Sequence, residues 1–406
     1  VSMKYYIYEN KCAEDFERLS LTRPVFDLRC GPFTFLERLF KLIPDSAEVS
    51  LIVRENLVNL AREMYPTLEV NPGDIEQGIW LLGNVFWMED DLKQITKTSS
   101  EIFQSEDMQI GANLSQQDGN DWMKAGGPVS ADLQLDLATT KLDSLPVNYL
   151  WEILQKIPWT MEEDTRHFLK RNEIVNSNQN LQVINPSNIW IEEPNKIKSA
   201  VVIDASKGSV IIEKNVDIGP FSYLKGPLFI GKGTIIYPHS QIKESVLGPV
   251  CRVGGEVAGT IIQGWSNKAH DGYLGDAFLG EWINLGAGTN NSNLKNNYTS
   301  VKVTVNGKVI DTGSLFIGSF IGDHSKTAIG TQLNTGTSIG IGCNIVSKEF
   351  PPRFIQPFTW FMNGKHISTK IETFIKTGET VKSRRGLSFS AAERELYRYL
   401  FVQKQK

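Results

Sequence analysis

Residues 212–242 read IEKNVD-IGPFSY-LKGPLF-IGKGTI-IYPHSQ-I, with an aliphatic residue at every sixth position. These residues are Ile212, Ile218, Leu224, Ile230, Ile236 and Ile242. An amphipathic helix repeats its apolar residues about every 3.6 positions and a half-buried strand about every second one, so neither explains this spacing. Short strands joined by regular corners, each strand sending one side chain inward, do explain it. The stretch therefore predicts a parallel β-helix built from hexapeptide repeats.

The same spacing returns further along the chain. It is found at Leu247 and Val253, and again at Leu315, Ile321, Leu333, Ile339 and Ile345, with Thr327 at the missing step. Glycine follows many of these residues, as in Ile218-Gly219 and Leu247-Gly248, and we expect it to provide the backbone angles of tight corners. The pair Pro351-Pro352 marks the predicted end of the coils.

Two local signals predict additions to the coils. Asn306-Gly307 lies between the alternating residues of 301–310, which predicts a type I′ hairpin that leaves the repeat. Ser390 and Glu393 have the spacing of a capping box, which predicts a terminal helix over about 390–405.

The first half of the chain alternates between strand-like and helix-like segments, which indicates a Rossmann-like α/β domain. A further helix is predicted from the capping-box spacing of Thr160 and Glu163. The expected strands are 4–8, 49–53 and 79–85, and the expected helices are 33–42, 55–64 and 159–171. We therefore expect an α/β domain over 1–195, the β-helix over 196–349 and a C-terminal extension with a helix over 350–406.

Composition limits the possible functions. The 406 residues include 41% hydrophobic residues and carry a net charge of −4, which argues against disorder and against a dedicated nucleic-acid surface. The four cysteines are far apart and form no Cys-x-x-Cys pair, so neither a zinc site nor a disulfide framework is predicted, and a reducing cytoplasm is the expected setting. No run of eighteen apolar residues and no signal-peptide core are present, so no membrane insertion is expected.

Polar residues gather in two segments, 267–277 (NKAHDGYLGDA) and 286–293 (GAGTNNSN), and they are too dense for a core. The first contains His270, and a histidine imidazole can accept a proton in catalysis. The glycine-rich residues 286–289 are a candidate source of main-chain N–H groups for an oxyanion. His324 lies on a later coil, either at a surface corner or within reach of a ligand across a subunit boundary, whereas the other histidines lack polar neighbours.

The segment around His270 resembles the acetyltransferase domain of the bifunctional N-acetylglucosamine-1-phosphate uridyltransferase and glucosamine-1-phosphate acetyltransferase family. The resemblance places His270 on the catalytic histidine, Tyr273 and Asn284 on residues that contact the sugar, and Asn293 on the asparagine near the acetyl group. It also implies a left-handed β-helix, acetyl-CoA as donor, and a homotrimer with its active site between neighbouring coils. A family lysine that contacts the sugar phosphate is replaced by Ala258, so the substrate is open. Lys268, with Lys295, Lys302 and Arg353, is a candidate for phosphate or CoA contacts.

Strings spread over nearly the whole chain resemble the divergent bacteroidetes-type branch of that family. They are residues 21–31, 254–257, 267–272, 292–298, 322–326, 334–337 and 350–354. The resemblance implies an N-terminal domain similar to sugar-1-phosphate nucleotidyltransferases, with Arg23 and Arg29 as candidates for phosphate binding. No glycine-rich loop follows the first strand, and Asn84 stands where such enzymes place the aspartate that binds Mg²⁺. Mg²⁺ is therefore only a candidate for this domain, and no metal ligands are assigned.

Two functions are predicted from these patterns. The favoured one is acyl transfer from acetyl-CoA to an amino-sugar phosphate or a nucleotide amino sugar, in nucleotide-sugar biosynthesis, with His270 as general base. The alternative is a sugar-1-phosphate nucleotidyltransferase whose β-helix serves only assembly or effector binding. The retained His270, Asn284 and Asn293 favour acyl transfer.

Overall fold

The computed structural model describes residues 3–96, 100–168, 181–192 and 195–404. The chain forms two compact units, which we describe separately. The first unit comprises Val1–Leu28, Phe33–Tyr149 and Ser390–Tyr399, and the second comprises Arg29–Pro32, Leu150–Phe389 and Leu400–Lys406. Within the described residues, no helix is both long and apolar enough to cross a membrane.

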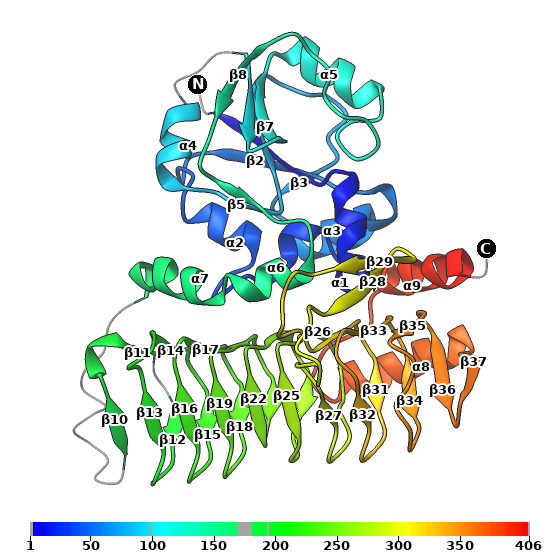
Figure 1. The fold of residues 1–406 in the computed structure, drawn as a ribbon. Helices are drawn as coiled ribbons and strands as arrows, with labels where there is room; N and C mark the ends of the chain where they lie inside the picture. Colours follow the sequence, from blue (N-terminus) through cyan, green and yellow to red (C-terminus); the bar gives the residue numbers. More distant parts are fainter. Residues whose placement is uncertain (1–2, 97–99, 169–180, 193–194, 405–406) are drawn as a thin grey trace. The chain divides into compact units, whose positions relative to one another are not determined.

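The first unit is an α/β domain around a sheet of order β3-β2-β1-β4-β7-β6-β8 (Figure 1). Its central strand β1 is parallel to both neighbours, and Tyr5–Tyr8 are buried, as expected for a strand covered on both faces. The sheet strands are β1 Lys4–Tyr8, β2 Glu48–Ile52, β3 Glu69–Val70, β4 Gly78–Leu82, β6 Glu101–Ser105, β7 Met108–Leu114 and β8 Ala138–Lys141, and β5 Val85–Phe86 pairs with β9 Leu145–Pro146. The helices are α1 Glu17–Ser20, α2 Phe35–Phe40, α3 Val58–Met64, α4 Glu89–Ile95 and α5 Gln116–Lys124. The predicted α/β class is confirmed.

The second unit is a parallel β-helix, whose stacked coils are visible in Figure 1. Its first sheet contains β10 Gln182–Ile184, β13 Val202–Asp204, β16 Tyr223–Lys225, β19 Gln241–Lys243, β22 Glu256–Ala258 and β25 Tyr273–Gly275. Its second contains β11 Ile189–Ile191, β14 Val210–Ile212, β17 Leu228–Ile230, β20 Val246–Leu247, β23 Ile261–Gly264, β26 Phe278–Glu281, β30 Ser319–Ile321, β33 Thr337–Ile339 and β35 Phe354–Ile355. Three strands per coil are typical of the left-handed β-helix that the sequence predicted.

The third face of the β-helix is continued by single bridges. Asn284 bridges Asn267 of one strand to Lys326 of the next, so the face is continuous. Its strands are β12 Lys196–Ile197, β15 Asp217–Ile218, β18 Ile235–Ile236, β21 Arg252–Val253, β24 Asn267–Lys268, β31 Lys326–Thr327, β34 Asn344–Val346, β36 Thr359–Met362 and β37 Lys365–Ser368. The remaining pairs are β27 Asn290–Asn291 with β32 Gln332–Leu333, and the predicted hairpin β28 Lys302–Val305 with β29 Lys308–Asp311.

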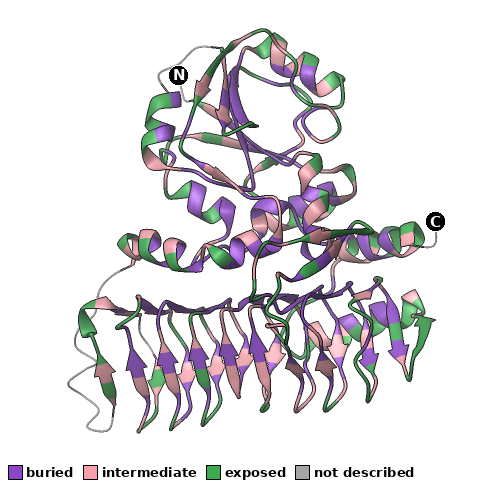
Figure 2. Ribbon diagram, in the orientation of Figure 1, coloured by how far each residue is buried: buried purple, intermediate pink, exposed green. Residues whose placement is uncertain are grey.

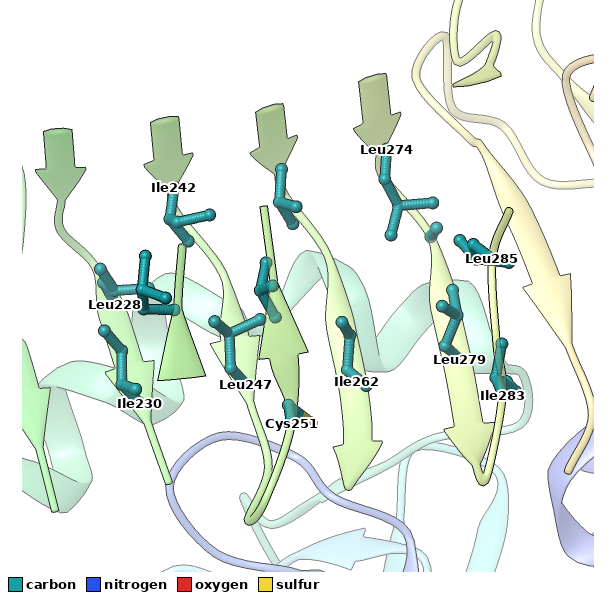
Figure 3. Close-up of a cluster of buried hydrophobic side chains, with 14 of the residues drawn as sticks. Leu228, Ile230, Ile242, Leu247, Cys251, Ile262, Leu274, Leu279, Ile283 and Leu285 are labelled. Carbon is teal, nitrogen blue, oxygen red and sulfur yellow. The ribbon is translucent and has the colours of Figure 1, made fainter. Parts of the chain in front are cut away.

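The aliphatic residues of the six-residue period point into the β-helix, where they stack from coil to coil. Ile212, Ile218, Leu224, Ile230, Ile236 and Ile242 are each at most 1% exposed. In register, Ile218 lies beside Ile236 and Leu224 beside Ile242, so identical positions of successive coils touch. Figure 3 shows this aliphatic column, and Figure 2 shows buried residues along the coils. Leu315 is an exception: it is 42% exposed because the chain has left the coil through the hairpin, and its place in the period is a coincidence.

The glycines that follow the inward residues have a different role from the predicted one. Gly219 and Gly248 do not have the left-handed backbone; instead, a Cβ on Gly248 would lie 2.0 Å from a main-chain oxygen of the next coil. The left-handed residue comes two positions later, at Phe221 (φ 60°) and Val250 (φ 58°). These glycines therefore allow close approach of adjacent coils, and the corner angle is adopted by a residue with a side chain.

Several predicted boundaries are wrong. Parallel pairing begins at Gln182 and continues to Met362, past the expected limits of 196 and 349, because Pro351 and Pro352 lie in a corner between strands and not inside one. The helix expected from residue 159 is α7 Ile157–Asp164, in which the Thr160 hydroxyl donates to the carbonyls of Lys156 and Ile157 instead of capping the N-terminus. Residues 169–171 of that expected helix lie outside the described part.

Three further helices belong wholly or partly to the second unit. The structure adds α6 Leu150–Gln155 and α8 Ile371–Ser383, neither of which was predicted. The predicted terminal helix is α9 Ala391–Lys404, which begins in the first unit and ends in the second. Its capping box is formed: the Ser390 amide donates to the Glu393 carboxylate at 2.8 Å, and the Glu393 amide donates to the Ser390 hydroxyl at 3.0 Å.

Candidate active site

The candidate site lies at the corner between β24 and β25. Lys268 ends β24, Tyr273 begins β25, and the exposed His270 lies in the turn between them. Gly272 in this turn has φ 128°, and a Cβ there would lie 2.2 Å from the carbonyl oxygen of Thr289 on the next coil. The turn is therefore packed tightly against the coil that follows, while the imidazole of His270 remains accessible to solvent.

Asparagine side chains replace the main-chain ladder beside this corner. The amides of Tyr273 and Gly275 donate to the side-chain oxygens of Asn290 and Asn291, both at 2.7 Å. The Asn291 side-chain amide donates back to the Gly275 carbonyl at 2.8 Å. Two side chains thus stand between β25 and the coil of β27, in place of direct main-chain hydrogen bonds.

A polar cluster forms on the face of β25. The Asn293 side-chain amide donates to the Tyr273 hydroxyl at 2.9 Å and to the Asp276 carboxylate at 2.6 Å. Burial, with the carboxylates of Asp276 and Glu256 nearby, raises the pKa of Tyr273 to about 12. Burial also raises the pKa of Asp276, although the hydrogen bond from Asn293 opposes this shift. Both donors of Asn293 are used within the cluster, and no hydrogen bond of the described residues uses its Oδ1, so a ligand N–H can donate there.

Asp276 was not predicted as a site residue. It follows Leu274-Gly275 in the quoted stretch, and it has φ 47° at the corner after β25. The signal available in the sequence was its place in the polar segment 267–277, which also contains His270 and Tyr273.

The structure distributes the predicted site residues unevenly. Tyr273 and Asn293 are in direct contact, and His270 lies on the turn that leads into β25. Asn284 is exposed on the third face, where its side-chain oxygen accepts a hydrogen bond from Asn267 at 3.3 Å. Lys268, which was predicted to bind substrate, is 2% exposed, and its ammonium donates to the main-chain carbonyls of Gly254 and His270.

Three of the four predicted oxyanion donors, residues 286–289, are engaged elsewhere. The amide of Gly286 donates to Thr327, that of Gly288 to Asp271, and that of Thr289 to Gly286. These three N–H groups complete the corner, so they are not free to stabilise an oxyanion.

An open pocket of about 690 Å³ lies next to Asn293 along the chain. Its lining contains Ser292, Leu294, Lys295, Asn296, Asn297, Asn334, Phe350 and Arg353. Phe350 is 60% exposed, which is unusual for a large apolar side chain, and Lys295 and Arg353 supply positive charge. A long ligand with an apolar part and anionic groups matches this lining.

His324 is neither a surface corner nor within reach of a ligand. It is 2% exposed and lies among aromatic rings: it stacks on Trp282 at 6.1 Å between centroids and meets Phe374 and Phe389 at 5.6 and 5.9 Å. Trp282 follows β26, Phe374 belongs to α8 and Phe389 to the segment after it, so a helix that the sequence did not predict helps to bury this corner.

In the first unit, the place of a phosphate loop after β1 is taken by an ion pair. Glu9 is fully buried, and its carboxylate accepts hydrogen bonds from the Val25 amide at 2.7 Å and from the Arg54 guanidinium at 3.0 Å. Arg54 also donates to the carbonyls of Ser20 and Arg23. The pair therefore ties the segment after β1 to residues 20–25.

The two arginines predicted to bind phosphate, Arg23 and Arg29, lie in different units. Arg23 is 3% exposed and is paired with Asp27 at 3.4 Å. Arg29 belongs to the second unit, where its amide donates to the Gln263 side chain at 2.9 Å and its guanidinium lies 5.7 Å from the Phe229 ring. Asn84 is fully buried, and its side-chain amide donates to the Val147 carbonyl at 2.6 Å.

A different pocket of the first unit lies at the carboxyl end of β1. It has a volume of about 320 Å³, and it is lined by Tyr8, Asn10, Lys11, Cys12, Asp107, Met108, Gln109, Trp122, Pro128, Ala131, Asp132 and Leu133. The carboxyl ends of parallel strands are where α/β sheets bind their ligands. No cluster of His, Cys, Asp and Glu suited to a metal ion occurs among the residues that the structure describes.

Parts of the chain are similar to known proteins. Residues 5–173 match the family described as sugar nucleotidyl transferase. A bifunctional sugar-1-phosphate nucleotidylyltransferase/acetyltransferase of Sulfurisphaera tokodaii is 39% identical over 33% of this chain and 34% of its own length, and the bifunctional protein GlmU of Rippkaea orientalis is 30% identical over 34% of each. These alignments span about a third of the relatives' length. Among solved structures, the polysialic acid O-acetyltransferase OatWY has a TM-score of 0.21 at 14% identity, covering 47% of this chain and 87% of that one.

The comparisons confirm the predicted relationship. Residues 5–173 match the sugar nucleotidyl transferase family, and about a third of the chain is similar to bifunctional nucleotidyltransferase/acetyltransferases.

Proposed function

We propose that the protein transfers an acetyl group from acetyl-CoA to the amino group of an amino-sugar phosphate or a nucleotide amino sugar. The observation that carries this proposal is the Tyr273–Asn293–Asp276 cluster next to the exposed His270, at a corner where asparagine side chains separate two coils. The relatives whose names include acetyl transfer support the same reaction class.

His270 would act as general base. As the amine nitrogen attacks the thioester carbonyl, a C–N bond forms, the imidazole accepts the amine proton, and the C–S bond breaks to release CoA, whose thiolate takes up a proton. A positioned base of this kind contributes roughly 10²- to 10⁴-fold in rate. Asn293 Oδ1 would accept a hydrogen bond from the ligand, and its position is fixed because both its N–H groups are held by Tyr273 and Asp276.

We propose a binding place for the acyl donor and one for the acceptor sugar. The acyl donor would extend into the 690 Å³ pocket, where Lys295 and Arg353 match the phosphates of CoA and Phe350 matches its apolar arm. The sugar would lie over Tyr273, with Asn284 contributing from the third face. We propose a homotrimer in the cytoplasm with neighbouring coils completing the site, and sedimentation as a monomer would contradict the trimer.

Nucleotidyl transfer is the second candidate function. It is favoured by the match of residues 5–173 and by the pocket at the carboxyl end of β1. The Glu9–Arg54 pair in place of a phosphate loop, and a buried Asn84 in place of an acidic ligand, leave Mg²⁺ without charged ligands in the expected positions. Acyl transfer is therefore the better supported activity.

Replacing His270 tests the proposal and separates the two functions. His270→Ala should lower acetyl transfer to a panel of amino-sugar phosphates by roughly 10²-fold or more, while any nucleotidyl transfer survives. His366→Ala is the matched control, because His366 is also exposed but lies on β37 in the terminal hairpin. Full acetyl transfer by the His270 variant would refute the assignment.

A further inference from the structure

A lysine occupies an inward position of the β-helix. Lys268 is paired in register with Val253 of the preceding coil, at the same position where Ile218 and Ile236 point inward. The next inward residue on this face is Leu285, which is 3% exposed. Lys268 itself is 2% exposed, so the column of aliphatic residues is interrupted at the coil that carries His270.

The ammonium of Lys268 is used by the main chain on both sides of the corner. Its Nζ donates to the carbonyl of Gly254 and to the carbonyl of His270, both at 2.8 Å. Gly255 leaves room for this arrangement, since a Cβ there would lie 2.9 Å from Nζ. The charged side chain thus joins the turn of the preceding coil to the turn that carries His270.

This arrangement is costly for the fold. Burial lowers the pKa of Lys268 to about 8, and Asp271 opposes this shift only in part. An aliphatic residue would continue the column without burying a charge. Local departures from the pattern of a fold are expected at functional sites. A functional role of Lys268 would therefore explain why the fold tolerates a buried charge at this position.

We propose that Lys268 is a positioning residue: it fixes the main chain of residues 269–272, so that His270 is held ready for proton transfer, and it does not touch the substrate. This inference rests on the proposed function, since it assigns Lys268 to the same site. Methionine has a similar length and no donor, so Lys268→Met removes the two hydrogen bonds and restores an apolar column. Leu285→Met is the matched control, because it also changes an inward residue of the same face.

Two measurements test the proposal. In Lys268→Met, kcat for acetyl transfer should fall by about 10- to 100-fold with less than about a threefold change in the KM of the amino sugar, because a displaced base affects the chemical step. Amide hydrogen exchange of residues 269–272 should become at least about tenfold faster. Leu285→Met should leave both unchanged.

The outcomes separate this inference from the proposed function. Unchanged exchange at 269–272 in Lys268→Met, or unchanged kcat in an otherwise active enzyme, would overturn it. A large rise in the KM of Lys268→Met, with unchanged hydrogen exchange at residues 269–272, would also overturn the inference and would indicate that Lys268 contacts the substrate directly. If the wild-type protein shows no acetyl transfer but exchange still rises in the variant, the proposed function fails while the positioning of the turn by Lys268 stands.

Discussion

Lys268→Met should also change how stability depends on pH. The pKa of Lys268 is 10.5 for an ordinary lysine and about 8 in the folded protein. Below pH 8 the ammonium is protonated in both states, and the folded protein bears the full cost of the buried charge. Between pH 8 and 10.5 the unfolded chain binds more protons than the folded one, so this group makes the wild-type stability rise with pH.

The magnitude follows from the two pKa values. Their difference, 10.5 minus 8, is 2.5 units. At about 1.36 kcal/mol per unit, the group contributes about 3 kcal/mol to the change in the free energy of unfolding across that window. The loss of the hydrogen bonds to Gly254 and His270 also destabilises the methionine variant. Methionine has no ionisable group, so position 268 adds no pH dependence to the stability of the variant. The difference in the free energy of unfolding between wild type and variant should therefore change with pH. This holds whichever of the two proteins is more stable at pH 7.

The assay is urea unfolding of both proteins at pH 7 and pH 10, with the difference between them taken at each pH. Because the two proteins share every other titrating group, the change in this difference isolates Lys268. We expect the variant to lose about 2 to 3 kcal/mol relative to wild type between the two pH values. A difference that stays constant from pH 7 to pH 10 would refute the reasoning, because it would mean that the ammonium is not desolvated.

Three further predictions concern other parts of the chain. Ile236→Ala should lower the free energy of unfolding by about 2 to 5 kcal/mol, whereas Leu315→Ala, at an exposed position with the same apparent period, should cost less than about 0.5 kcal/mol; equal losses in urea unfolding would contradict the inward stack. Arg54→Ala should destabilise the first unit by about 3 to 5 kcal/mol, because Glu9 would remain buried without its partner, and a thermal unfolding profile like that of wild type would contradict this. Asn293→Ala should reduce kcat/KM for acetyl transfer by at least about tenfold, with Asn344→Ala, on β34 and outside the pocket lining, as a control; equal kinetics of the Asn293 variant and wild type would remove Asn293 from the site.

The repeat was predictable because its cause is local. Each inward residue of the coils needs only an aliphatic side chain at the right spacing, so Ile212 to Ile242 specify their own stacking. The capping box of Ser390 and Glu393 is local in the same way. Thr160 had the same spacing but lies inside a helix that begins at Ile157, since Pro158 in the first turn outweighs the capping signal.

The site was predictable in part. The family strings placed Tyr273 and Asn293 in one site, and the structure brings them into contact. The strings could not indicate that Lys268 points inward, because that depends on the register of the coil, or that Arg23 is already paired with Asp27. His324 was misread for a similar reason: α8, which covers it, is encoded far away in the sequence.

The left-handed positions two residues beyond the close-approach glycines have an evolutionary consequence. Phe221 and Val250 take this conformation with φ of 60° and 58°, and at other corners Trp282 and His324 have φ 60° and Asp276 has φ 47°. Because such different side chains share one backbone angle, the residue type at this corner is independent of the aliphatic column inside the β-helix. Single substitutions at the corner of one coil can therefore introduce new ligand-binding side chains, while the aliphatic column inside the β-helix stays the same.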